Sequence, residues 1–125
     1  MTISVILPAK NEVEGLRRTL PKLRAWGGHA EIIVVDDGST DATAAVAASL
    51  GAKVLSSPYS MGNGAAIKRG ARVATGDVLV FMDADGQHDP AGIDALLAKL
   101  DEGYDMVVGA RDWNGQAGVH RGMAN

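Results

Sequence analysis

The amino-acid sequence predicts an α/β fold with three layers, in which helices cover both faces of a mostly parallel, open sheet. Five short apolar runs, rich in Val and Ile, lack the polar alternation of a half-exposed strand, as is typical of parallel strands buried on both faces. Helical spacing of apolar residues separates these runs, so strands and helices alternate along the chain. The predicted strands are residues 3–7, 31–35, 52–55, 78–82 and 106–108.

Four helices are predicted between the strands. They cover residues 13–23, 41–50, 65–74 and about 90–100. Pro21 lies inside the first pattern and would either kink that helix or split it,. Gly51 is a natural stop for the second helix, and Ser39 or Thr40 can serve as its N-cap,. Asp89 as N-cap and Pro90 at the first helical position predict the start of the fourth.

Composition limits the classes of function. Hydrophobic residues make up 46% of the 125 residues and the net charge is −3, which is ordinary for a soluble domain and gives no general attraction to nucleic acid,. There is no cysteine, which excludes disulfides and thiolate chemistry and suits a reducing compartment,. No apolar run approaches the ~20 residues of a membrane-spanning helix. The chain enters its first strand pattern without a signal peptide, so we expect a cytoplasmic domain.

Residues 1–111 are expected to form one core domain, which ends with the Gly-Ala-Arg segment (109–111) that follows the last predicted strand. Beyond residue 109 the periodicity is lost, and no strand or helix is predicted. Residues 112–125 are therefore expected to be a polar tail that is either disordered or the start of a further part.

Two acids follow the fourth predicted strand. Asp83 and Asp85 are two residues apart, so in extended chain both side chains point the same way,. Hard oxygen ligands that converge at a strand end suit Mg²⁺ or Mn²⁺, which keep other positions for water and phosphate oxygens. The alternative is that these acids only cap the next helix and face solvent. Gln87 and His88 follow on the same loop, and they favour a site.

Other polar residues gather at the same predicted edge, where ligands of open α/β sheets bind. Asp37 ends the second strand and could accept hydrogen bonds from a base or a ribose,. The Gly62-Asn63-Gly64 segment opens the third helix and could cradle phosphate, although glycine there also serves a simple turn. Arg111 could reach a diphosphate, or could begin the polar tail,.

The ordered set of motifs resembles the family 2 glycosyltransferases with the GT-A fold, a Rossmann-like nucleotide-diphospho-sugar transferase fold. The resemblance is strongest to the dolichol-phosphate-mannose synthase-like and polyprenyl-phosphate glycosyltransferase branch, and covers residues 1–111. It is carried by Val-Ile-Leu-Pro-Ala-Lys-Asn-Glu (5–12), Ile-Val-Val-Asp-Asp-Gly-Ser-Thr-Asp (33–41), Gly-Asn-Gly-Ala-Ala (62–66), Gly-Asp (76–77), Phe-Met-Asp-Ala-Asp-Gly-Gln-His-Asp-Pro (81–90) and Val-Gly-Ala-Arg (108–111). Lys10, Gly86 and Ala110 depart from the aromatic, larger apolar and serine residues common at those positions. Because family members are longer, the chain resembles an incomplete GT-A fold, its N-terminal donor-binding part.

The resemblance implies roles for individual residues along the donor. Those that would line the nucleotide pocket are Pro8, Lys10 and Glu12, with Val35 and Asp37 contacting base and ribose. Those that would face the metal, the diphosphate and the sugar are Asp83, Ala84, Asp85 and Gln87, with Arg111 pairing with the diphosphate.

The resulting expectation is an inverting glycosyltransferase domain that binds a GDP- or UDP-sugar through Mg²⁺ or Mn²⁺. The resemblance implies a dolichyl or undecaprenyl phosphate acceptor at the cytoplasmic face of the membrane. No general base is identifiable. One alternative is a domain that binds the nucleotide sugar without turnover. A nucleotidyltransferase would usually carry a Gly-rich basic loop after the first strand, and a response-regulator-like domain would need an Asp where Ser56-Ser57-Pro58 stands.

Overall fold

The computed structural model describes residues 2–26, 30–85, 91–101, 106–108 and 118–121 of the chain. The strands are β1 (Ile3–Ala9), β2 (Glu31–Asp37), β3 (Lys53–Ser57), β4 (Val78–Phe81), β5 (Met106–Val108) and β6 (Gly118–Arg121). The helices are α1 (Val13–Ala25), α2 (Thr43–Ser49), α3 (Asn63–Val73) and α4 (Ala91–Asp101). The alternation of strand and helix predicted from the sequence is therefore confirmed up to β5.

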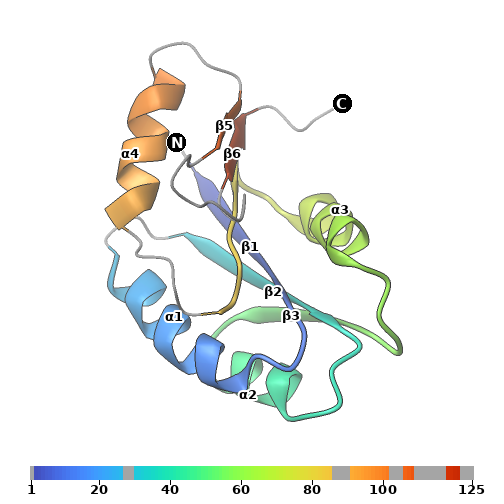
Figure 1. Ribbon diagram of the computed structural model, residues 1–125. Helices are drawn as coiled ribbons and strands as arrows, with labels where there is room; N and C mark the ends of the chain where they lie inside the picture. The colour runs from blue at the N-terminus through green and yellow to red at the C-terminus, as the bar shows by residue number, and fades with distance from the viewer. Residues whose placement is uncertain (1, 27–29, 86–90, 102–105, 109–117, 122–125) are drawn as a thin grey trace.

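The strands form one sheet in the order β3-β2-β1-β4-β6-β5 (Figure 1). β1 pairs in parallel with β2 and with β4, and β2 pairs in parallel with β3. β6 is antiparallel to both of its neighbours, β4 and β5. The sequence predicts no strand beyond residue 109. This prediction is wrong, because β6 lies in the segment expected to be a polar tail.

Helices cover both faces of the sheet, as predicted (Figure 1). Side chains that alternate along each central strand divide between two hydrophobic clusters, because successive residues of a strand point to opposite faces. On one face Val5 and Leu7 of β1 pack with Leu16 and Leu20 of α1, in a cluster that also takes in α2 and α4. On the other, Ile6 of β1 packs beneath α3. This fixes β1 at the centre of three layers.

Two details of the helices bear on the predictions. α1 is one helix through Pro21, which lies on its exposed side, so of the two alternatives the split is excluded. α2 begins at Thr43, and its amide donates to Asp41 Oδ1 at 3.0 Å, whereas Ser39 and Thr40 do not cap it. Those two residues bond instead to Asn11 of a neighbouring loop. The predicted cap at Asp89 and Pro90 lies outside the described residues.

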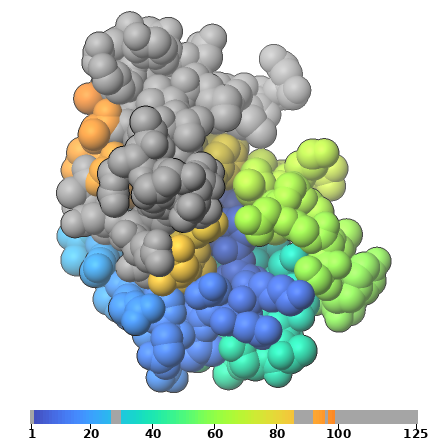
Figure 2. All heavy atoms as spheres, in the orientation of Figure 1, coloured from blue at the N-terminus to red at the C-terminus, as the bar shows by residue number. Residues whose placement is uncertain are grey.

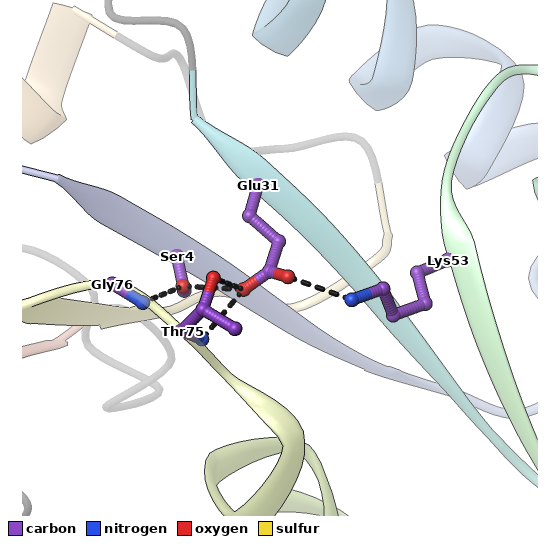
Figure 3. Close-up of polar contacts among 5 residues, drawn as sticks. All are labelled: Ser4, Glu31, Lys53, Thr75 and Gly76. Atoms are coloured by element: carbon purple, nitrogen blue, oxygen red, sulfur yellow. Dashed lines mark hydrogen bonds and ion pairs between the residues drawn. The ribbon is translucent and has the colours of Figure 1, made fainter.

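A polar cluster lies at the edge of the sheet where β2 begins (Figure 3). Glu31 Oε1 accepts hydrogen bonds from Ser4 Oγ at 2.7 Å and from the Thr75 amide at 2.9 Å, and Lys53 Nζ lies 2.8 Å from Oε2. Burial alone would raise the pKa of Glu31, but the hydrogen bonds and charge from Lys53, with those from Thr75 and Ser4, lower it to about 2,. This cluster joins three strands and the turn before β4.

Within the described residues, no helix is long and apolar enough to cross a membrane.

Candidate functional site

Parallel pairing brings the carboxyl ends of β1, β2, β3 and β4 to one edge. Pro8 of β1 is opposite Val35 of β2, and Asp37 at the end of β2 is opposite Ser57 at the end of β3. On the other side of β1, the Met82 amide donates to the Ile6 carbonyl at 3.0 Å, so Asp83 emerges directly beyond the paired strand. Among the described residues, Pro8, Val35, Asp37 and Asp83 therefore lie along this edge, which includes the region where the amber chain after β4 adjoins blue α1 in Figure 2.

Glu12, Asp83 and Asp85 form an acidic group at this edge. All three side chains are half-buried. Burial raises the pKa of Glu12, and the negative charges of Asp85 and Asp83 raise it further, partly opposed by Arg18,. The electrostatics thus favour a cation here.

The donor set fits a magnesium or manganese ion. In the described part of the chain, no three His, Asp or Glu side chains are arranged to hold a metal together. A site with one or two carboxylates is nonetheless what Mg²⁺ commonly uses, with water and phosphate oxygens as its remaining ligands. Asp83 and Asp85 therefore suit a cation that arrives with a diphosphate better than a permanently caged one.

The segment that carries these acids packs tightly against α1. A Cβ at Gly15, in the first turn of α1, would stand 2.0 Å from the Ala84 carbonyl oxygen and 2.9 Å from the Asp85 carbonyl carbon. An Arg18 guanidinium nitrogen also lies 3.5 Å from the Asp85 carbonyl oxygen. Only glycine allows this close approach, so α1 fixes the position of Asp83 and Asp85.

Asp37 is buried and its carboxylate holds the loop between β3 and α3. It accepts hydrogen bonds from Ser60 Oγ at 2.9 Å, from the Met61 amide at 2.7 Å and from the Gly62 amide at 3.0 Å. Burial would raise the pKa of Asp37, but these hydrogen bonds, with the charge of Lys10, lower it,. In addition to any ligand contact, Asp37 therefore organises the turn that leads into α3.

Side-chain hydrogen bonds tie the β1–α1 loop to the β2–α2 loop. The Asn11 amide donates to Ser39 Oγ at 2.9 Å, and Asn11 Oδ1 accepts from the Thr40 amide at 2.9 Å. The Glu12 amide donates to Thr43 Oγ1 at 3.1 Å. Sequence patterns single out Ser39 and Thr40 only as caps, and Thr43 not at all.

The other predicted site residues divide by exposure. Lys10 is exposed at the edge, close enough to Asp37 to lower its pKa. Pro8, Val35 and Ala84 are buried. The Val35 side chain packs beneath α3, so contact with a nucleotide there would have to use the backbone. The predicted residues Gln87 and Arg111 lie outside the described residues, as does His88.

The chain matches a known family over nearly its whole length. Residues 4–125 match the family described as Glycosyl transferase family 2. An uncharacterized glycosyltransferase of Mycobacterium tuberculosis is 42% identical over 118 residues, which make up 94% of this chain and 51% of that protein. The dolichol-phosphate mannosyltransferase of Pyrococcus furiosus is 38% identical over 117 residues, covering 89% of this chain and 33% of that protein. The chain thus spans about half or less of the length of these relatives.

Solved structures share the fold. Glucosyl-3-phosphoglycerate synthase from Mycobacterium tuberculosis, in complex with Mn²⁺, uridine diphosphate and glucosyl-3-phosphoglycerate, superposes with a TM-score of 0.75 and 35% identity. The match covers 86% of this chain and 43% of that chain. The predicted GT-A architecture is confirmed.

Proposed function

Since this chain belongs to glycosyl transferase family 2, we propose that it binds the donor of a metal-dependent sugar transfer at the carboxyl edge of its sheet. The donor is a nucleoside-diphosphate sugar, with GDP- and UDP-sugars the first candidates. The observation that carries the proposal is the convergence of Glu12, Asp83 and Asp85 at the edge where β2 also ends in buried Asp37, with the pKa of Glu12 raised by burial and by the two aspartates. The manganese and uridine diphosphate named for the solved relative support it.

Each residue has a role in this proposal. Asp83 and Asp85 hold Mg²⁺ or Mn²⁺, and the nucleoside lies toward Pro8, Lys10, Val35 and Asp37. Gln87 and Arg111 are assigned to the sugar and the diphosphate by the family resemblance. When bound, the metal supplies positive charge that stabilises the departing nucleoside diphosphate.

The reaction is a single inverting displacement. An acceptor oxygen forms a bond to the anomeric carbon while the bond from that carbon to the diphosphate oxygen breaks, and the electron pair leaves with the diphosphate. An alcohol acceptor would need a general base to take its proton. A polyprenyl phosphate is already ionised and would need no such base. The acceptor named for the Pyrococcus relative, dolichol phosphate, supports this class and a place at the membrane surface.

Calorimetry and thermal shift test donor binding. UDP-, GDP- and dTDP-sugars are added to the chain with Mn²⁺ or with EDTA. A donor at about 100 times its Kd should add about 2.7 kcal/mol of stability, on the order of 10 °C in Tm, only when Mn²⁺ is present. Asp85→Ala should abolish the effect. Glu14→Gln is the matched control, because Glu14 is an exposed carboxylate on α1 that pairs only with Arg17 among the described residues.

Two results would contradict the proposal: no nucleotide sugar raising Tm with Mn²⁺, or Asp85→Ala binding like the unaltered chain. The alternative from the sequence is a domain that binds the nucleotide sugar without turnover. A radiolabelled-sugar transfer assay with membrane extract separates the two, because labelled lipid formed by the added chain excludes the binding-only function.

A further inference from the structure

Asn11 has an unusual backbone conformation and side-chain-mediated hydrogen bonds to two residues of another loop. Its φ is 53°, and it is the one residue other than glycine with positive φ in the described part of the chain. Such a conformation is uncommon outside glycine, although asparagine tolerates it better than most residues. Asn11 is exposed, so burial does not impose this geometry. The hydrogen bonds it makes are therefore the evident cause.

Those bonds reach across to a different loop. Asn11 donates its amide to Ser39 Oγ and accepts from the Thr40 amide at 2.9 Å, and Thr40 Oγ1 lies 3.3 Å from the same carboxamide oxygen. Asp36 Oδ1 accepts from the Ser39 amide at 3.0 Å, which ties the same loop back to the end of β2. The link thus runs from β2 to the β1–α1 loop through a continuous set of hydrogen bonds.

The two joined loops carry opposite ends of the candidate site. Glu12, the acid beside Asp83 and Asp85, follows Asn11 directly. Asp37, which holds the β3–α3 loop, lies on the other side of the link, two residues before Ser39. A further bond, from the Glu12 amide to Thr43 Oγ1 at 3.1 Å, joins the loops on the acidic side.

We propose that Asn11 is a positioning residue that sets the spacing between the nucleoside side of the site at Asp37 and the metal side at Glu12. The proposal rests on the proposed function, in which one nucleoside diphosphate spans both sides. Because a ligand that contacts two separate loops loses affinity when it must order them, fixing the loops in advance strengthens binding. A ligand that contacts only the metal side gains little from the link.

Asn11→Gly tests the link cleanly. Glycine adopts positive φ without strain and keeps the backbone amide, so the change removes mainly the carboxamide. Asn11→Asp should rescue, because its carboxylate keeps an acceptor for the Thr40 amide. Ser49→Ala is the matched control, since it deletes one side-chain hydrogen bond, from Ser49 Oγ to the Val46 carbonyl at 2.7 Å, within α2 and away from both loops.

Amide hydrogen exchange without ligand is the first readout. In Asn11→Gly the Thr40 amide loses its acceptor directly, and the coupling predicts that the Ser39 and Glu12 amides also exchange about 10-fold faster. Asn11→Asp and Ser49→Ala should leave those two amides near their original rates. Faster exchange confined to Thr40 would overturn the proposal, whatever the chain binds.

Ligand binding with Mn²⁺ is the second readout, with UDP, GDP and inorganic pyrophosphate as probes. Asn11→Gly should weaken the nucleoside diphosphate that binds the unaltered chain by about 10-fold and pyrophosphate by less than about 2-fold. Equal loss for both probes would overturn the positioning role. If neither UDP nor GDP binds the unaltered chain, the proposed function fails, and the exchange result alone still decides whether Asn11 couples the loops.

Discussion

Gly15 offers the sharpest test of how α1 positions the acidic segment. In Gly15→Ala the new methyl group would stand 2.0 Å from the Ala84 carbonyl oxygen, where ordinary contact begins at 3.4 Å. The nearest obstructing atom belongs to the backbone, so the segment must move by about 1.4 Å,. Displacement of binding groups by about 1 Å can cost about 100-fold in function. We therefore expect Mn²⁺-dependent nucleotide affinity to fall at least about 10-fold.

The free energy of unfolding of this variant should fall by about 0–2 kcal/mol. Overpacking costs about 1–3 kcal/mol, whereas alanine in place of glycine within a helix gains about 1 kcal/mol. Calorimetric titration of UDP or GDP with Mn²⁺, beside a urea melt, measures both. Gly92→Ala in α4 is the control, because nothing lies within 4 Å of a Cβ there. Gly15→Ala with the affinity and stability of the unaltered chain would refute the tight packing of α1 on this segment.

Three further predictions concern charge and backbone geometry. The pKa of Glu31 is lowered from 4.5 to about 2. Its carboxylate therefore contributes fully to the free energy of unfolding above about pH 5, and this contribution is lost as pH falls toward 2. By linkage this contribution is about 3 kcal/mol at most. Glu31→Gln should therefore flatten the acid side of a stability-pH curve measured by urea melts. An unchanged curve would contradict the prediction. Asp37→Asn replaces one acceptor oxygen by a donor where three groups donate. The free energy of unfolding should therefore fall by about 1–3 kcal/mol, seen as a lower urea midpoint. An unaltered midpoint would count against the role of Asp37. Gly38→Ala places a Cβ at positive φ, 2.5 Å from the Ser60 amide nitrogen. The free energy of unfolding should fall by at least about 1 kcal/mol. An unchanged Tm would exclude the close approach.

Much of the fold follows from local patterns. β1, β2 and β4 are runs of Val, Ile and Leu buried on both faces, and they lie within two residues of the predicted bounds. β6 could not be predicted in this way. Gly118–Arg121 holds one aliphatic residue in four, and it becomes a strand by pairing with β4, some 40 positions earlier in the chain. Its strand character comes from its neighbours, which a local pattern does not contain.

The candidate site could likewise be predicted only in part from the sequence. Parallel topology places Asp37, Asp83 and Asp85 at one edge from the sequence alone, because ligands meet the carboxyl ends of such strands. The start of α2 could not be predicted, because Ser39, Thr40 and Asp41 are all good caps, whereas the observed N-cap is Ala42 and the first two residues bond to Asn11 of another loop. Gly15 did leave a signal, since a glycine inside a helical pattern often marks close packing.

The proposed site places the metal of a nucleoside-diphosphate donor on Asp83 and Asp85. The most direct measurement is an anomalous difference map at the manganese edge, from crystals grown with Mn²⁺ and UDP or GDP. We expect a peak about 2.0–2.3 Å from carboxylate oxygens of Asp83 or Asp85 and next to the diphosphate. Diphosphate bound without a manganese peak at these aspartates, or a peak at another group of side chains, would contradict it.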